Sequence, residues 1–261
     1  MTQRIDGRSS NELRPLKISY NPFGYADASV LFEVGNTKVL VSVTLQNGVP
    51  PFLKGKKTGW LTAEYAMLPS ATNQRTTRES SSAQKNGRSV EISRLIGRCL
   101  RPLVDLNSLG EKTIYIDCDV LQADGGTRVA SITAASVALE HAALKWLHTG
   151  QVSKNVFREP IAGISVGIVN GQMLLDPSQS EDSQADADFN FVLTKQGNIL
   201  ELQGTAEKVP MAWNHFDELK GLAIKGISEL FAFFAAEAKP GGNADKSIKA
   251  PFFSLGNRKD S

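Results

Sequence analysis

The sequence predicts an α/β fold in which helices cover mixed β-sheets, and two patterns carry this prediction. Hairpin signals, in which β-branched strands flank a short turn rich in Gly or Asn, recur three times and favour antiparallel pairing. Between them, strand and helix patterns alternate, which favours a layered arrangement. The 261 residues, 41% of them hydrophobic, are enough for one large domain or two small ones with a sizeable core.

The first third of the chain predicts strands and two polar loops. The predicted strands cover residues 16–19, 29–34, 38–43 and 60–68. The two central strands flank Gly35-Asn36-Thr37 and form the first hairpin. Residues 47–58 form a loop with two prolines and three lysines. Residues 70–87 are rich in Ser, Thr, Asn and Arg and lack hydrophobic periodicity, so we expect a long functional loop there.

The middle of the chain predicts two helices separated by a strand. Ser89 is expected to cap the first helix, whose apolar face consists of Val90, Ile92, Leu95, Ile96, Cys99 and Leu100. A strand follows at 113–121. The second helix covers 127–148 and begins with small residues, which indicates close packing against a sheet. We therefore expect it to be the central buried helix.

The last third predicts two further hairpins and a final helix. The strands cover 161–168 with 173–175 around Asn170-Gly171, and 189–194 with 199–203. An acidic loop separates the hairpins, and Asn214 is expected to cap the final helix. The first and last hairpin-to-helix units are alike, which indicates a duplicated module. We predict one domain over 1–238, made of two similar halves, and a flexible tail over 239–261.

Composition excludes several classes of protein. The chain has no apolar run long enough to span a membrane, and its N-terminal residues lack the apolar stretch of a signal peptide. Its two cysteines, Cys99 and Cys118, lack the spacing of a zinc or redox motif. The three histidines stand outside any motif, so zinc or histidine-based nucleophilic chemistry has little support. We expect a reduced, cytoplasmic protein.

Charge is unevenly distributed in a chain whose net charge is only +2. Residues 54–101 hold ten Lys or Arg against three Glu, whereas residues 176–190 hold five acids and no Lys or Arg. Such segments are commonly solvated surfaces. They also fit a polyanion bound beside a metal ion.

Residues 117–131 are the first candidate site, because an apolar strand runs through Gly125-Gly126 directly into the long helix. The first N–H groups of a helix lack internal partners and favour an anion, and glycines allow a ligand to approach the backbone. Thr127 is expected to cap the helix or donate its hydroxyl, and Arg128 adds a forked positive charge. An ordinary turn is the alternative.

Asp182 and Asp188 are the second candidate site. Asp182 lies in the acidic loop and Asp188 at the mouth of the strand that follows. Two such carboxylates can bind one Mg²⁺ or Mn²⁺ and leave positions for water and phosphate oxygens, although a solvated acidic loop is the alternative. No general base for activating water is evident. A nucleophile that is already anionic, such as inorganic phosphate, needs none.

In combination, the motifs of this chain resemble those of the ribonuclease PH family, phosphate-dependent 3′→5′ exoribonucleases that trim transfer-RNA 3′ ends. The resemblance extends to about Lys239. The matching stretches are 4–8, 59–65 with 67–69, 87–92 with 94–98, 117–128, 165–169, 181–182 with 188, and 203–207.

The resemblance implies a role for each of these motifs. The residues implied in phosphate binding are Arg88, Gly126, Thr127 and Arg128. The implied catalytic and metal-binding residues are Asp182 and Asp188, and the implied RNA-guiding residues are Arg75 and Arg78. The family assembles as a hexameric ring, a trimer of dimers, and its fold is a duplicated α/β unit like the second domain of ribosomal protein S5.

Three positions depart from the family pattern. Ser70 stands where many members carry Arg, which weakens one expected RNA contact. Val129 and Ala135 replace residues that are more usually Thr and Gly, and we expect them to affect packing more than chemistry.

Two other functions compete with a phosphorolytic nuclease that trims tRNA precursors. One is a non-catalytic RNA-binding subunit of an exosome-like ring, which would lack the carboxylates or the phosphate arginines that this chain has. The other is a hydrolytic nuclease, which would release nucleoside monophosphates rather than diphosphates.

Overall fold

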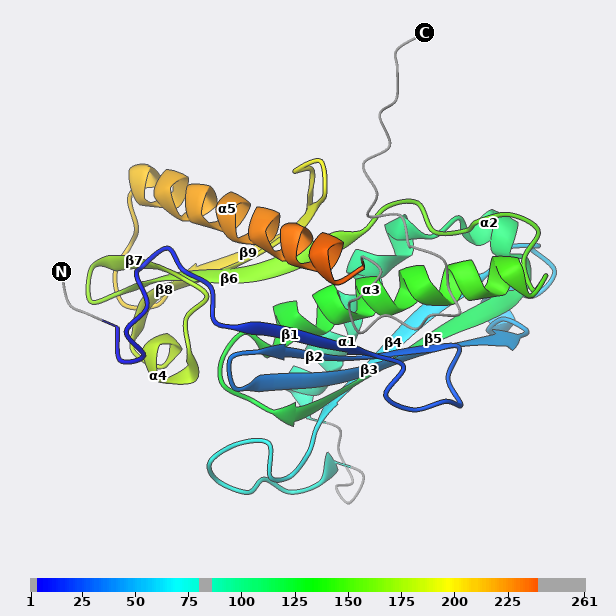
Figure 1. Cartoon of the computed structure of the whole chain (residues 1–261), viewed down its shortest axis with the longest axis horizontal. Coiled ribbons are helices and arrows are strands. Elements are labelled where there is room, and N and C mark those ends of the chain that lie inside the picture. The colour runs from blue at the N-terminus through cyan, green and yellow to red at the C-terminus, as the bar shows by residue number, and fades with distance from the viewer. Residues whose placement is uncertain (1–3, 80–85, 239–261) are drawn as a thin grey trace, which may run out of the picture.

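Two β-sheets with helices between and beside them make up the structure, a computed structural model that describes residues 4–79 and 86–238 (Figure 1). The predicted tail at 239–261 lies outside the described residues. The first sheet has the order β1-β2-β3-β5-β4 and the second the order β7-β6-β8-β9. All neighbours are antiparallel except β4 and β5, which are parallel.

The strands of the first sheet are β1 (Leu16–Tyr20), β2 (Ala28–Val34), β3 (Thr37–Asn47), β4 (Trp60–Met67) and β5 (Lys112–Gln122). Those of the second sheet are β6 (Ile161–Val169), β7 (Gln172–Leu175), β8 (Ala185–Thr194) and β9 (Ile199–Ala206). The α-helices are α1 (Gly87–Leu100), α2 (Leu106–Leu109), α3 (Thr127–His148), α4 (Gln179–Asp182) and α5 (Trp213–Glu237). Short 3-10 turns cover Pro51–Leu53 and Arg101–Leu103.

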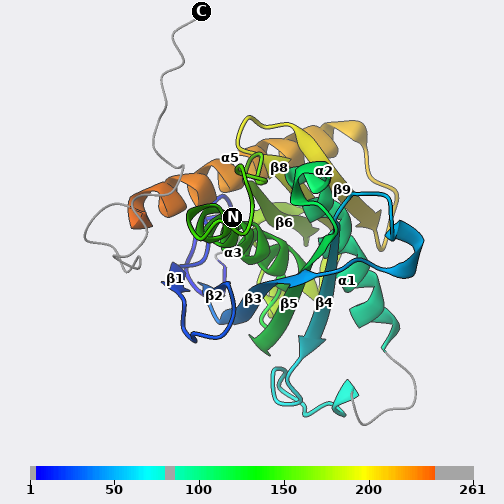
Figure 2. The ribbon, with the colours of Figure 1, turned by 90° about the vertical axis from the view of Figure 1, so that its right-hand side faces the viewer.

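Helix α3 lies between the two sheets. It packs against β2, β3 and β5 on one side and against β6 and β8 on the other, and Figure 2 shows it end-on among these strands. Gly163 of β6 faces Val129 of α3, whereas Ile164 faces Gly226 of α5. Successive residues of a strand point to opposite faces, so α3 and α5 cover opposite faces of the second sheet. Helix α1 packs against β4 and α3.

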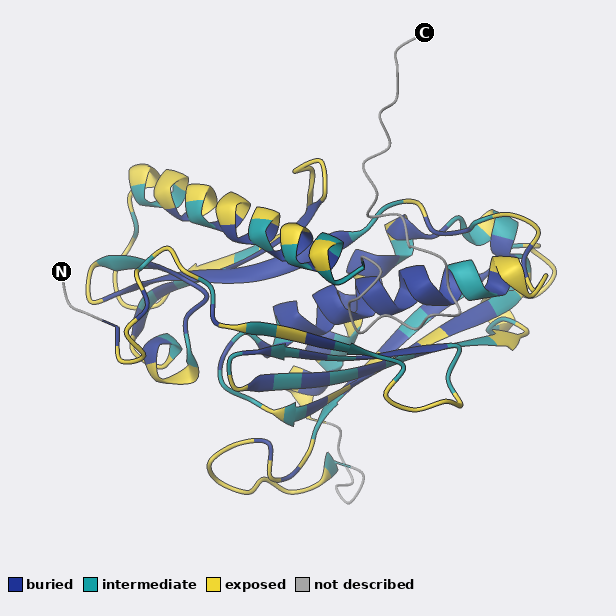
Figure 3. Cartoon of the chain, viewed as in Figure 1, coloured by how far each residue is buried: buried dark blue, intermediate teal, exposed yellow. Residues whose placement is uncertain are grey.

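The pattern of buried and exposed residues follows from the layers of helices and sheets (Figure 3). Strands β3 and β5 alternate buried and more exposed residues because a helix covers only one face of the first sheet. Strand β6 is buried at all nine positions because both of its faces are covered. The expectation that the small-residue helix is the central buried one is confirmed, since α3 is buried along most of its length.

The three predicted hairpins are confirmed. The turn between β6 and β7 has positive φ at both Asn170 (50°) and Gly171 (74°), the conformation that Asn-Gly favours in a two-residue hairpin. The predicted mixed α/β class is likewise confirmed. In the described part of the chain, no helix is long and apolar enough to cross a membrane.

Two predicted helix caps, Ser89 and Asn214, are wrong. Helix α1 is capped by Asn86, whose side chain accepts a hydrogen bond from the Arg88 N–H, while Ser89 donates to Glu79 instead. Of the two roles expected of Thr127, capping is not observed, because Gly126 is the N-cap of α3. Helix α5 begins at Trp213 with Ala212 as its N-cap, so Asn214 lies inside the helix.

The acidic segment was also predicted incorrectly. It contains the short helix α4, and β8 begins at Ala185, so Asp188 lies inside a strand rather than before it. A capping box explains α4: Ser178 and Glu181 satisfy each other's backbone N–H groups.

The turn between β5 and α3 requires glycine. Gly125 and Gly126 have φ values of 82° and 66°, which L-residues rarely adopt. A Cβ at Gly125 would lie 2.6 Å from the carbonyl oxygen of Pro177. The turn is therefore pressed against the backbone that leads from β7 into α4, and this contact brings the two halves of the chain together.

Replacing Gly125 with Ala tests this contact. We expect Gly125→Ala to lower the free energy of unfolding by about 2–4 kcal/mol, because the side chain adds a clash to an unfavourable φ. Gly150→Ala is the matched control: its φ is 72° and no atom lies within 4 Å of the added Cβ, so only the φ penalty remains, about 1 kcal/mol. Urea denaturation measures both variants. Equal losses would show that the backbone contact has no energetic consequence.

Candidate active site

A cavity of about 190 Å³ opens at the N-terminus of α3. Its lining residues come from α1, α3, α4, β6 and β8, from the turn before α3 and from the residue after β9: Arg88, Gly126, Thr127, Arg128, Ser165, Asp182, Asp188, Asn190 and Glu207. All six residues predicted to bind phosphate or metal are among them, although α1 and β8 are about 100 residues apart in the chain. The structure thus joins the two candidate sites of the sequence into one.

One side of the cavity is suited to an anion. Arg88 is exposed in the first turn of α1, and Arg128 is held by Gln203 (3.0 Å) and by an ion pair with Glu91 (3.3 Å). The Thr127 hydroxyl accepts a hydrogen bond from the Tyr65 hydroxyl at 3.0 Å, so its own proton is available for a ligand. The unpaired N–H groups that begin the 22-residue helix α3 add a positive dipole end.

Burial of Tyr65 reinforces this hydrogen bond. It raises the pKa of the Tyr65 phenol, although the hydrogen bond to Thr127 and the nearby Arg88 oppose the shift. Tyr65 therefore keeps its proton at neutral pH and remains a donor. This arrangement agrees with the expected hydroxyl donation by Thr127, whereas the expected cap is not formed.

The other side of the cavity holds the carboxylates. Asp182 ends α4, and Asp188 is the fourth residue of β8. Burial raises the pKa of Asp182, and Glu207 adds to the shift. Burial, and then repulsion from Asp182, raises the pKa of Asp188 to about 6. Because repulsion from Asp182 disfavours the charged form of Asp188, a cation bound beside the two carboxylates would be favoured.

The donor set fits a hard divalent cation. Within residues 4–79 and 86–238 there is no group of three or more His, Cys, Asp or Glu that could hold a metal ion by itself. Mg²⁺ commonly binds through only one or two carboxylates and takes its other ligands from water and substrate phosphates. Asp182 and Asp188, beside an anion site, provide that environment.

Four residues around the cavity received no individual role from the sequence. Ser165 and Asn190 pair across β6 and β8, both are buried, and the Ser165 hydroxyl donates to the Asn190 side-chain carbonyl at 2.7 Å. The Asn190 amide then donates to Asp188 at 3.2 Å. Tyr65 and Glu207 complete the surroundings. In the sequence, each of these four residues is only a polar residue within a predicted strand or just after one. That pattern is too common to indicate a site.

Arg75 and Arg78 do not line this cavity. Both are exposed in the segment between β4 and α1, before the undescribed residues 80–85. Their predicted RNA-guiding role stays a prediction.

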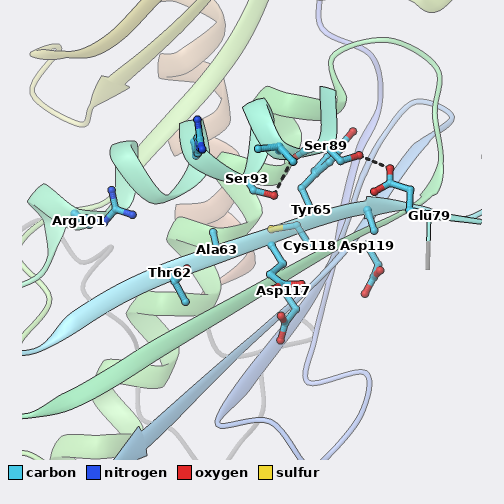
Figure 4. Close-up of a pocket in the computed structure, with 14 residues that line it drawn as sticks. Thr62, Ala63, Tyr65, Glu79, Ser89, Ser93, Arg101, Asp117, Cys118 and Asp119 are labelled. Carbon is cyan, nitrogen blue, oxygen red and sulfur yellow. Dashed lines mark hydrogen bonds between the residues drawn. The ribbon is translucent and has the colours of Figure 1, made fainter. Parts of the chain in front are cut away.

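A larger cavity of about 610 Å³ lies beside β4, β5 and α1 (Figure 4). Glu64, Asp117 and Asp119 contribute carboxylates to it. Burial raises the pKa of Asp117, assisted by Glu64 and Asp119, and burial also raises that of Asp119. Glu79, Arg94 and Arg101 also line this cavity, so its lining carries charges of both signs. Tyr65 separates the two cavities, since it lines the larger one and hydrogen-bonds to Thr127 in the smaller.

Comparisons with known proteins identify the family of this chain. The family model for the 3′ exoribonuclease family, domain 1, matches residues 12–145, and the model for domain 2 matches residues 159–223. Ribonuclease PH of Neisseria meningitidis serogroup C is 51% identical over 223 residues, which cover 85% of this chain and 92% of that protein.

Solved structures show the same fold. The Archaeoglobus fulgidus exosome with RNA bound to the active site has a chain that is 25% identical, with a TM-score of 0.74 over 89% of this chain and 92% of that one. An archaeal exosome core has a chain that is 27% identical, with a TM-score of 0.70 over 87% and 89%.

The pKa of Asp188 predicts how stability depends on pH. Because its pKa is about 6 in the folded protein and 3.8 ordinarily, the folded state binds the proton more tightly. Without a divalent cation, the free energy of unfolding therefore falls as the pH rises through this window. Asp188→Asn stays neutral, so we expect it to raise the free energy of unfolding at neutral pH by about 1–2 kcal/mol.

Urea denaturation in EDTA across a pH series measures this effect. Asp186→Asn is the control two residues away, because hydrogen bonds from Lys208 and Gly171 lower the pKa of Asp186 and the substitution should not stabilise. A parallel pH dependence in the wild type and Asp188→Asn would contradict the prediction.

Proposed function

Since this chain belongs to the 3′ exoribonuclease family, we propose that it is a phosphorolytic 3′→5′ exoribonuclease that trims the 3′ ends of tRNA precursors. Family membership supports exonucleolytic RNA processing, and the cavity supports the choice of nucleophile. In the same proposal the enzyme acts in the cytoplasm. Its two cysteines are free and buried, in keeping with a reducing compartment.

One observation carries the proposal: an anion-binding site formed by Arg88, Thr127 and Arg128 lies in the same cavity as the carboxylates of Asp182 and Asp188. A substrate phosphodiester bound by a metal on Asp182 and Asp188 does not by itself need Arg88, Thr127, Arg128 and the start of α3. A second phosphate bound beside that phosphodiester would need these groups. Inorganic phosphate is already an anionic nucleophile, so catalysis needs positioning and charge compensation rather than the activation of water.

In the proposed reaction, Arg88, Thr127 and Arg128 hold hydrogen phosphate beside the terminal phosphodiester of the RNA. An oxygen of the phosphate bonds to that phosphorus, and the bond from phosphorus to the 3′-oxygen of the preceding nucleotide breaks. The proton of the hydrogen phosphate passes to the departing 3′-oxygen. The products are a nucleoside 5′-diphosphate and an RNA that is one nucleotide shorter and ends in a 3′-hydroxyl.

The chain's own carboxylates hold the cation in this proposal. Mg²⁺ or Mn²⁺ bound to Asp182 and Asp188 would offset the negative charge that develops at the reacting phosphorus. Asn190 orients Asp188 through its hydrogen bond. Because a phosphoanhydride replaces the phosphodiester, the reaction should also run in reverse and add nucleotides from diphosphates.

Assembly forms part of the proposal. We propose a homo-hexamer, a trimer of dimers, because family relatives are found in exosome structures and a single chain offers only a short basic surface to a folded RNA. Arg75 and Arg78, exposed beyond the cavity, would contact the RNA backbone.

Product analysis tests the proposed reaction. With a 3′-extended tRNA, Mg²⁺ and phosphate, we expect nucleoside 5′-diphosphates, and we expect no decay when phosphate is omitted. Release of nucleoside monophosphates without phosphate would instead identify a hydrolytic nuclease, and RNA binding without any product would identify a non-catalytic ring subunit.

Arg88→Ala tests the anion-binding site. We expect kcat/KM for phosphate to fall by on the order of 100-fold, since one donor to a reacting anion is lost, while the thermal melting temperature stays close to that of the wild type. Arg94→Ala is the control, because Arg94 is exposed on the same helix but does not line this cavity. Full phosphate-dependent activity in Arg88→Ala would remove Arg88 from the mechanism.

A further inference from the structure

Three buried arginines from the N-terminal segment lie behind the candidate active site. Arg4, Arg8 and Arg14 are only 6%, 9% and 4% exposed, although arginine is seldom fully buried unless it is paired. Their partners are Asp176 and Glu181, together with carbonyl oxygens on both sides of the cavity. None of these five side chains lines the cavity itself.

Arg14 is attached to the glycine turn. Its guanidinium forms a fork with Asp176, with Nη2 at 2.6 Å from Oδ1 and Nε at 2.9 Å from Oδ2. The same guanidinium donates to the carbonyl oxygens of Asp124 and Gly125, the two residues that lead into the cap of α3. Arg14 thus ties the turn to the end of β7.

Thr37 holds the same turn from the other side. Its hydroxyl donates to the Gly125 carbonyl at 2.8 Å and accepts from the Asp124 N–H at 3.0 Å. The position of the first N–H groups of α3 therefore depends on two side chains that make no direct contact with the cavity.

Arg4 is attached to the carboxylate side. Its Nε and Nη2 each lie 2.7 Å from an oxygen of Glu181, the residue before Asp182. Its remaining donors reach the carbonyl oxygens of Leu175 (2.9 Å) and Asp176 (3.0 Å). Helix α4 has only four residues, too few to be stable alone, so these bonds and the Ser178 capping box determine where Asp182 lies.

Arg8 lies between the contacts of Arg14 and those of Arg4. It donates to the Asp176 carbonyl at 3.2 Å, pairs with Asp6 at 2.7 Å and approaches Glu181 at 3.7 Å. Glu181 also accepts a hydrogen bond from the Ser178 N–H at 2.8 Å, so its carboxylate is held from both sides. A planar five-donor guanidinium can satisfy several acceptors at once, whereas a lysine ammonium cannot reproduce the fork.

We propose that Arg14 and Arg4 are positioning residues with separate tasks: Arg14 sets the affinity for phosphate through the glycine turn, and Arg4 sets the affinity for the divalent cation through α4. This inference rests on the proposed function, because it takes the two ligands from it. Partners that orient the groups of a binding site commonly change affinity by about 10- to 100-fold when they are lost.

Arg14→Lys and Arg4→Lys test the separation in the full-length protein, by titration calorimetry with inorganic phosphate and by electron paramagnetic resonance with Mn²⁺. We expect Arg14→Lys to weaken phosphate binding by about 10-fold or more with nearly unchanged Mn²⁺ binding, and Arg4→Lys to do the reverse. In turnover, Arg14→Lys should raise KM for phosphate more than it lowers kcat.

Arg101→Lys is the matched control. Arg101 is a partly buried arginine that donates to the Leu61 carbonyl at 3.0 Å and stacks over Trp60, away from this cavity. We expect it to leave both affinities unchanged. If a lysine variant fails to fold, Thr37→Val and Ser178→Ala replace it as milder changes at the turn and at α4. We expect Thr37→Val to weaken phosphate binding and Ser178→Ala to weaken Mn²⁺ binding.

The outcomes separate the inference from the function on which it rests. A wild type that binds neither phosphate nor Mn²⁺ would overturn the proposed function. A wild type that binds both, with variants that keep both affinities or lose both equally, would overturn the separate positioning roles and leave the proposed function standing.

Discussion

The candidate site depends on one close approach between two backbones. At the Gly125 turn, the segment that joins β5 to α3 touches the carbonyl of Pro177, in the segment that joins β7 to α4. The first segment leads into α3, which begins with Thr127 and Arg128, and the second leads through α4 and β8 to Asp182 and Asp188. Any side chain at this point would separate the two. The absence of a Cβ therefore has a functional consequence, because it sets the distance between the anion-binding site and the carboxylate pair.

Charge balance makes this approach possible. Carbonyl oxygens of both segments point into the interface, where unpaired acceptors would be costly. Buried guanidinium groups satisfy several of them, and Asp176 and Glu181 compensate the charge of those groups. Burial alone would lower the pKa of Arg14, but the bond to Asp176 raises it, so the network stays ionised. The cavity beside it places Asp182 and Asp188 near Arg88 and Arg128, so that it offers carboxylates to a cation and guanidinium groups to a phosphate.

Much of the local structure followed from sequence because it depends on near neighbours. Hairpin turns such as Asn170-Gly171 depend on backbone conformations that few residues adopt, and strand and helix periods identify the buried faces. The small residues at the start of α3 indicated its burial before any partner was known. Where near neighbours compete, the predictions failed: Asn86 and Ser89 are both capable caps, and Glu79, ten residues before Ser89, engaged the serine.

The sequence by itself determined the class of fold, the turn before α3 and the residue types of the site; the family resemblance assigned their roles. Only the tertiary structure decided that Arg88 and Asp188 line the same cavity, that β4 runs parallel to β5, and that Arg4 and Arg14 reach across to Glu181 and Asp176. The physical reason is the distance along the chain over which each interaction acts. Backbone propensity and side-chain period act over a few residues, whereas a buried ion pair forms between groups more than 150 residues apart only after two sheets have packed on α3.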